Sequence, residues 1–264
     1  KKLPVFDVMT MAATGSEYDG AGVITNDETK EKLSVGGCFP VASILDPTYT
    51  MTVPAKQTAA GVSDIISHTF EQYFVAEGSM LSDGICESML KTVMHYGPIA
   101  LREPDNFEAR GEIFAASSFG CCGLLALGRT KSAWPCHGIE HELSAFYDCA
   151  HGAGLAVILP AWMEYVLPHD PVRLAQFAVR VFGCEMNFAD PEATARQGIE
   201  KLCLFFHSLG MPITFDELGA KAKDIPDMVA HRAEKPGGFP FGGFVKIQPA
   251  DMEAILRLAA GEAQ

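Results

Sequence analysis

The sequence has little positive charge and no apolar run long enough to cross a membrane. Its 20 Lys and Arg residues are outnumbered by 33 Asp and Glu residues, so the formal net charge is −13. Such an acidic balance argues against a protein that binds nucleic-acid backbones or anionic membrane surfaces. The longest uncharged run, residues 113–128, is shorter than the roughly 20 apolar residues of a membrane span and is expected to be a buried helix. We therefore expect neither a nucleic acid nor a membrane as a partner.

Common nucleotide-binding loops and targeting signals are missing as well. Neither GxGxxG nor GxxxxGK[ST] occurs, so the residues alone indicate no standard dinucleotide-binding fold and no P-loop. Residues 1–4 do not include Met and do not resemble a signal peptide, so we expect the sequence to start inside a longer chain. Eight cysteines without any CxxC spacing indicate reduced thiols in a cytoplasmic protein, and we expect no disulfides.

The 264 residues suffice for one or two domains, and the secondary-structure pattern of the sequence changes near residue 50. Before this point, short β-prone runs alternate with Gly, Asn and Asp-Pro turn signals. After it, helical periodicity dominates, and Asp190 followed by Pro191 is the clearest helix start. Strands are expected near residues 23–25, 33–35 and 41–45, helices near 55–75, 82–95, 105–128, 133–146, 152–166, 171–183, 190–209 and 250–260, and a loop over 231–247. The second part is therefore expected to be all-α.

Four of the eight histidines stand at spacings that suit a metal site. Asp64 and His68 are four residues apart, so on a helix their side chains share one face. His137 and His141 repeat this spacing, and His151 follows ten residues after His141. Imidazole and carboxylate together suit borderline ions such as Zn and Fe. Such pairs also arise by chance on ordinary helices, so the spacing alone leaves both interpretations open.

Two further segments carry weaker signals. The small and hydroxyl-bearing run from Thr10 to Glu17 offers backbone N–H groups and hydroxyls to a phosphate or a ring. The dipeptide His169-Asp170 is of a kind found in metal-dependent phosphohydrolases, but the prolines on both sides place it in a loop. Neither segment identifies a site without further information.

Taken in order, these segments resemble one known family. Residues 10–17, 45–47, 61–64 with His68, then His137, His141 and residues 151–152 resemble the iron-containing (group III) alcohol dehydrogenases. The resemblance is strongest to the branch of butanol dehydrogenases and NADPH-dependent aldehyde reductases, and it runs from about residue 3 to about residue 215. It implies a divalent ion held by Asp64, His68, His137 and His151, and it places His141 close to the nicotinamide and the substrate. It implies cofactor contacts at Thr10, Met11, Ala12, Ala13, Thr14, Val23 and Lys32.

The resemblance also implies the fold. Members of the family begin with an α/β nucleotide-binding domain that contains a Gly-Gly-Gly-Ser turn, and no such turn occurs here. We therefore expect a mainly α protein, with a C-terminal all-helical metal-binding domain preceded by a remnant of strands from the α/β domain. Residues 1–50 are the expected remnant, and residues 51–264 the expected all-α catalytic domain.

The implied activity is reversible hydride transfer between NAD(P)H and a primary alcohol or aldehyde, with a small-molecule substrate and a homodimeric assembly. The cofactor is either NADP(H) or NAD(H). The ion is Fe by family, and Zn, Mn or Ni fit the same three-imidazole, one-carboxylate set. We expect the chain to be inactive without the nucleotide-binding domain. Two alternatives are an all-α metal-dependent phosphohydrolase and a non-catalytic structural or dimerising domain.

Overall fold

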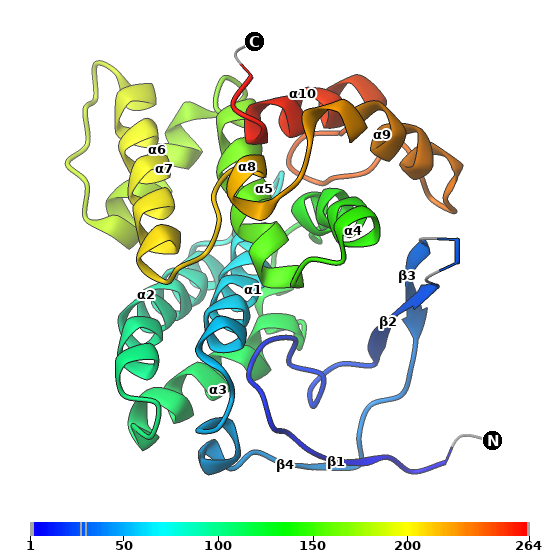
Figure 1. The fold of residues 1–264 in the computed structure, drawn as a ribbon. Coiled ribbons are helices and arrows are strands. Elements are labelled where there is room, and N and C mark those ends of the chain that lie inside the picture. The colour runs from blue at the N-terminus through cyan, green and yellow to red at the C-terminus, as the bar shows by residue number, and fades with distance from the viewer. Residues whose placement is uncertain (1–2, 27, 30, 263–264) are drawn as a thin grey trace.

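The computed structural model describes residues 3–26, 28–29 and 31–262, and in this part of the chain short strands are followed by a large helical body (Figure 1). The mainly α fold class is thereby confirmed. The strands are β1 (Phe6–Val8), β2 (Ala21–Asn26), β3 (Glu31–Gly36) and β4 (Ala42–Ile44). The α-helices are α1 (Ala55–Tyr73), α2 (Met80–Arg102), α3 (Phe107–Cys121), α4 (Pro135–Tyr147), α5 (His151–Val166), α6 (Pro171–Phe182), α7 (Pro191–Ser208), α8 (Phe215–Leu218), α9 (Ile225–Glu234) and α10 (Pro249–Ala259). Short 3-10 turns lie at Pro47–Thr50, Leu124–Ala126 and Ala222–Asp224.

Helices α1 and α5 form the centre of the helical body. From Thr58 to Tyr73, every residue of α1 is buried, and α5 is buried on nearly all sides. A helix without a solvated face has to be enclosed by other elements. Helices α2, α3 and α4 pack against α1, while α4, α7 and α10 pack against α5. The polar residues of α1 therefore lie inside the molecule, where each needs a partner.

The ends of the outer helices follow their sequence signals. Asp190 accepts a hydrogen bond from the backbone N–H of Ala193 and Pro191 is the first residue of α7, as the sequence predicts. Asp170 caps α6 in the same way, and Gly183 ends that helix with a positive φ of 66°. Local capping therefore fixes where these helices begin and end.

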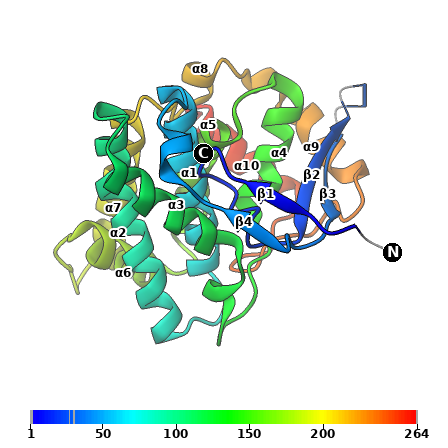
Figure 2. The same cartoon turned by 90° about the horizontal axis from the view of Figure 1, so that it is seen from below.

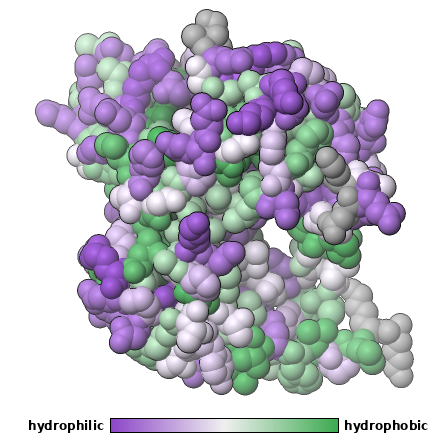
Figure 3. Space-filling view, in the orientation of Figure 1, coloured by the Kyte–Doolittle hydropathy of each residue, from purple (hydrophilic) through white to green (hydrophobic). Residues whose placement is uncertain are grey.

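The four strands form two separate pairs beside the helices (Figure 2). β1 pairs in parallel with β4, and β2 pairs with β3 as an antiparallel hairpin. Parallel sheets are ordinarily covered on both faces. Here the apolar side chains of these strands and their loops are exposed, and they contribute to the green surface in the lower part of Figure 3. The largest exposed fractions belong to Leu3, Phe6, Phe39, Val41, Ile24 and Ile44.

The structure corrects three expectations. The helix expected over 105–128 ends at Cys121, because Gly123 adopts a φ of 85° that breaks the helix before a 3-10 turn. The loop expected over 231–247 begins only after Glu234, because α9, which was not expected, includes its first residues. Strand β1 was missed as well. Among the described residues, no helix is long and apolar enough to span a membrane.

Candidate metal centre

One carboxylate oxygen lies at the centre of three imidazoles. The Oδ1 atom of Asp64 lies 3.6 Å from Nε2 of His68, 3.6 Å from Nε2 of His137 and 3.7 Å from Nε2 of His151. The rings of His68 and His137 stack at a centroid distance of 4.7 Å, and the rings of His137 and His151 are 5.1 Å apart. The structure thus brings together all four residues that the resemblance implies as metal ligands.

Three helices deliver these side chains. Asp64 and His68 stand one turn apart on α1, while His137 lies in the first turn of α4 and His151 is the first residue of α5. The start of α5 reaches α1 because residue 152 is Gly. A Cβ atom at this position would lie 1.9 Å from the carbonyl oxygen of Ala60, so any larger residue would push α5 away. Close helix packing therefore sets the position of His151.

The four donors fit a divalent cation. Asp64 Oδ1 and His137 Nε2 are buried and have no hydrogen-bond partner among the described residues, although buried polar atoms are normally paired. Ligand bonds of about 2.1 Å in a tetrahedral site would put neighbouring ligand atoms about 3.4 Å apart, close to the 3.6–3.7 Å from Asp64 Oδ1 to each Nε2. The donor atoms of Asp64, His137 and His151 all lie within 4.8 Å of one another, and His68 approaches this group at Asp64. Three imidazoles and one carboxylate also suit Zn and Fe chemically. An ion among these atoms would satisfy both unpaired groups.

Two buried glutamates support the imidazoles from behind. The Nδ1 atom of His137 contacts Glu71, and Nδ1 of His151 contacts Glu140; both carboxylates are almost fully buried. A carboxylate accepts but does not donate, so each Nδ1 carries the proton and each Nε2 is left to face Asp64. These two positioning residues were missed in the sequence. Glu71 lies two helical turns after Asp64, and Glu140 one turn after His137, so helical spacing was the available signal.

Lys32 of β3 also reaches this centre. Its Nζ atom lies 3.4 Å from Oε2 of Glu140 and 3.3 Å from Nδ1 of His151. When the imidazoles are neutral, the three carboxylates of Asp64, Glu71 and Glu140 and the single ammonium group of Lys32 leave two negative charges. A divalent cation would balance that charge.

Burial and neighbouring charges set the proton affinities. Burial raises the pKa of Asp64, but the three imidazoles outweigh it and hold that pKa well below its usual range. Burial lowers the pKa of His68 to about 4, and Asp64 only partly offsets this. For His137, burial also lowers the pKa, but the carboxylates of Glu71 and Asp64 dominate and raise it to about 10. Without an ion, His137 therefore retains a second proton at neutral pH.

His141 lies beside this set rather than within it. Its ring centroid is 5.6 Å from that of His151, and its ring nitrogen can share a cluster with Glu140 and His151. Burial lowers the pKa of His141 to about 2, and the positive charge of Lys32 acts in the same direction. His141 is therefore a neutral imidazole at physiological pH. Since Lys32 already faces Glu140 and His151, a second cation there would meet like charge.

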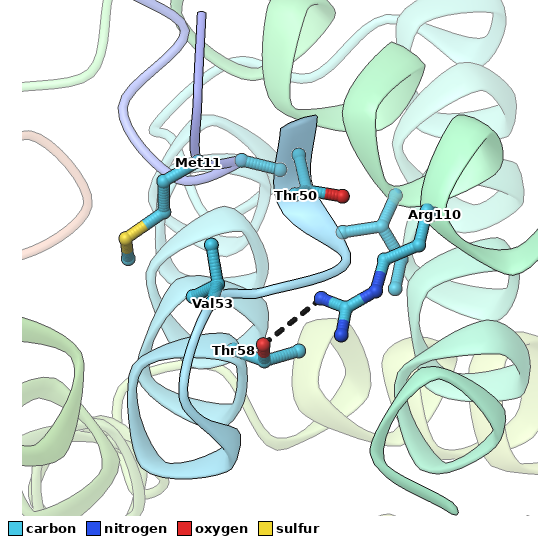
Figure 4. Close-up of a pocket in the computed structure, with 7 residues that line it drawn as sticks. Met11, Thr50, Val53, Thr58 and Arg110 are labelled. Atoms are coloured by element: carbon cyan, nitrogen blue, oxygen red, sulfur yellow. Dashed lines mark hydrogen bonds between the residues drawn. The ribbon is translucent and has the colours of Figure 1, made fainter. Parts of the chain in front are cut away.

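The expected cofactor loop lies close to Asp64. Thr10, Met11, Ala12, Ala13 and Thr14 form the segment after β1, with both threonines exposed. A Cβ atom on Gly61 would lie 2.3 Å from the carbonyl oxygen of Ala12, so glycine permits the loop to touch α1 one turn before Asp64. A small cavity of about 10 Å³ lies beside Met11 and Ala12 of the loop and has room for about one water. Figure 4 shows Thr58 and Arg110 in its lining.

The structure also places two aromatic residues and Val23, which is an expected cofactor contact. Trp134, whose φ of 49° is rare for a bulky residue, packs edge-on against the rings of His68 and His137. Phe146 instead packs against His231, and Val23 is exposed on β2. Trp134 therefore forms an apolar surface beside the rings of His68 and His137.

The dipeptide His169-Asp170 has a structural role. The ring of His169 packs edge-on against Phe244, and Asp170 caps α6 by accepting from the N–H of Arg173. The structure therefore gives no support to the phosphohydrolase alternative. All eight cysteines are free thiols in this structure.

Comparison with known proteins agrees with this geometry. The sequence model described as "Fe-containing alcohol dehydrogenase family, C-terminal" matches residues 58–260. The chain is 44% identical to NADH-dependent butanol dehydrogenase A of Clostridium acetobutylicum over 98% of its own length and 66% of the relative. It is 33% identical to the NADPH-dependent aldehyde reductase YqhD of Escherichia coli over 86% of its length and 59% of the relative.

Solved structures give the same result. The fold is similar to that of NADH-dependent butanol dehydrogenase A from Thermotoga maritima, with a TM-score of 0.93 and 38% identity over 98% of this chain and 67% of that one. The chain thus spans about two thirds of the length of these relatives. The match of the family model to most of the chain, together with these relatives, places the protein in the iron-containing alcohol dehydrogenase family.

Proposed function

We propose that this chain is the metal-binding part of an NAD(P)H-dependent alcohol dehydrogenase that interconverts a primary alcohol and an aldehyde. The observation that carries the proposal is the convergence of three imidazole Nε2 atoms on Asp64 Oδ1, with two of these buried atoms left unpaired. The names of the relatives support the same reaction class.

In this proposal, Asp64, His68, His137 and His151 hold the ion. A bound divalent metal would act as a Lewis acid on the substrate oxygen, and a bound nicotinamide would supply or accept the hydride. The chain's own residues prepare the site. Glu71 and Glu140 hold two imidazoles in the tautomer that presents Nε2, and Trp134 covers the adjacent apolar side.

His141 would act as a hydrogen-bond acceptor for the substrate hydroxyl or the cofactor. Its low pKa keeps the ring neutral at physiological pH, so one ring nitrogen donates a hydrogen bond and the other accepts one. The loop from Thr10 to Thr14, with Val23 and Lys32, would contact the cofactor. Lys32 would do so next to Glu140.

The exposed strands support the proposed division into domains. β1 and β4 form a two-stranded parallel pair with exposed apolar residues, and such pairs ordinarily belong to a larger covered sheet. We propose that residues 1–50 belong to an α/β nucleotide-binding domain, that residues 51–264 form the metal-binding domain, and that the assembled enzyme is a homodimer. Turnover would then require both domains.

Two measurements, metal binding and turnover, test the proposal. Calorimetric titration with Zn²⁺ or Fe²⁺ should show one site in the wild type and its loss in His137→Ala, while replacement of the exposed His207 of α7, in His207→Ala, should leave binding like that of the wild type. Unchanged affinity in His137→Ala would refute the metal site.

NAD(P)H oxidation with butyraldehyde should be absent in this chain and should appear when a nucleotide-binding domain is joined before it. Metal binding without turnover in the longer chain would favour the non-catalytic alternative.

A further inference from the structure

His231 of α9 connects the helical body to the β2–β3 hairpin. Its Nδ1 atom lies 2.6 Å from Oε2 of Glu142 on α4, and its Nε2 atom lies 3.3 Å from the backbone carbonyl oxygen of Thr29. Glu142 is fully buried, and its other oxygen accepts from Nζ of Lys235 at 2.7 Å. Residues that are 202 positions apart in the sequence thereby meet at the turn of the hairpin.

Both partners of the His231 ring are acceptors. A main-chain carbonyl has no proton to donate, and a carboxylate that is paired with an ammonium group accepts as well. A neutral imidazole carries one N–H and can satisfy only one of the two. Both contacts are therefore made together only by the doubly protonated, positively charged ring.

The charged groups around His231 all interact with the carboxylate of Glu142. From α4 the ring faces the carboxylate of Glu142, and from the hairpin it faces the carbonyl of Thr29. From α9 and its end, Lys235 and Arg232 also interact with Glu142, and the guanidinium of Arg232 lies over the ring of Phe241. The fully buried carboxylate is thus the group around which all three cations gather.

The hairpin depends on such contacts. Every residue of β2 is exposed, and an isolated two-stranded hairpin is marginally stable in water. Thr29 lies three residues before Lys32, whose Nζ contacts Glu140 and His151. Holding the turn at Thr29 therefore also holds the lysine against the metal centre.

We propose that His231 is a positioning residue, which in its doubly protonated form latches the β2–β3 turn to Glu142 and so keeps Lys32 against Glu140. The latch is a contact within this chain and does not depend on the proposed reaction. What Lys32 then does for a cofactor rests on the proposed function.

Amide hydrogen exchange tests the latch on the chain as it stands. After correction for intrinsic rates, the amides of β2 and β3 should exchange about 10-fold faster in His231→Phe than in the wild type, because the charge-assisted hydrogen bond that holds the turn is lost. The matched control His207→Phe, which removes an exposed histidine of α7, should keep the wild-type pattern.

A second measurement does not depend on how well the variant folds. In wild-type protein with ¹⁵N-labelled histidine, one histidine should show both ring nitrogens protonated under the conditions in which the hairpin is protected, and this signal should be absent in His231→Phe. A neutral His231 in the protected state, or hairpin exchange that is the same in His231→Phe and in the wild type, would overturn the proposal. Neither readout involves metal or substrate, so the latch and the proposed function can fail separately.

Discussion

The candidate metal centre buries polar side chains, whereas strands β1 to β4, the strand layer, expose apolar side chains. At the metal centre, acidic and imidazole side chains from α1, α4 and α5 are buried against one another. In the strand layer, apolar side chains such as Phe6 and Ile44 are exposed. Buried polar groups need partners and exposed apolar groups need cover. The buried cluster of the helical region is thus suited to a cation, whereas the exposed strands are suited to a covering surface.

The largest effect is expected at Asp64. Asp64→Asn keeps the size of the side chain but removes the charge that faces three imidazoles. We expect the affinity for Zn²⁺ or Co²⁺ to fall by more than the roughly 10–100-fold that loss of an outer partner costs. Isothermal titration calorimetry of this variant beside wild type measures the change. Wild-type affinity in Asp64→Asn would show that the buried cluster is not a metal site.

A smaller effect on the same region is expected at Glu71. Glu71→Gln weakens the acceptor behind His137, and we expect metal affinity to fall by about 10–100-fold. Glu87→Gln is the matched control, because Glu87 is also a buried carboxylate but pairs with Tyr73 and Arg180 away from the imidazoles. Equal effects of the two substitutions in the same titration would mean that Glu71 acts only through overall stability.

The pH dependence of metal binding should also reflect the metal centre. In metal-free protein the pKa of His137 is raised to about 10, so below that pH a proton occupies the group that must bind the ion. Binding then releases this proton, and affinity rises with pH, about 10-fold per unit from pH 6 to 9. The pKa of His68, about 4, adds no dependence in this range. Calorimetry in two buffers of different ionisation enthalpy counts the released protons; zero release would contradict the assignment.

The smallest effect is expected in the strand layer. Phe6 is 68% exposed, so Phe6→Ser should change the free energy of unfolding by no more than about 0.5 kcal/mol. Phe70 is fully buried in α1, and Phe70→Ala should cost about 3–5 kcal/mol. Urea denaturation of this chain measures both. A large loss on Phe6→Ser would mean that the strand surface is already covered, for instance by a second copy.

The sequence predicted the parts of the site that local geometry controls. The spacing of Asp64 and His68 is meaningful because one helical turn brings both onto the same face, and Asp190-Pro191 fixes a helix start for the same local reason. Helix α9 was missed because it is short and precedes a glycine-rich stretch. It is held by the burial of Ile225 and Met228, which is a tertiary effect.

Contacts between distant segments could not be predicted in this way. The pairing of Glu71 with His137 and of Glu140 with His151 depends on how α1, α4 and α5 pack. Lys32 was expected only as a cofactor contact, and its approach to Glu140 depends on where the hairpin lies. These contacts carry no periodic signal, so only the folded chain reveals them.

The most direct test of the metal centre is a crystal structure of this chain grown with Co²⁺, with the ion located by anomalous scattering. The account predicts one strong peak bonded to Asp64 Oδ1 and to Nε2 of His68, His137 and His151, with Glu71 and Glu140 still behind the rings. A protein that remains free of cobalt at these four atoms, or that binds it only elsewhere, would contradict it.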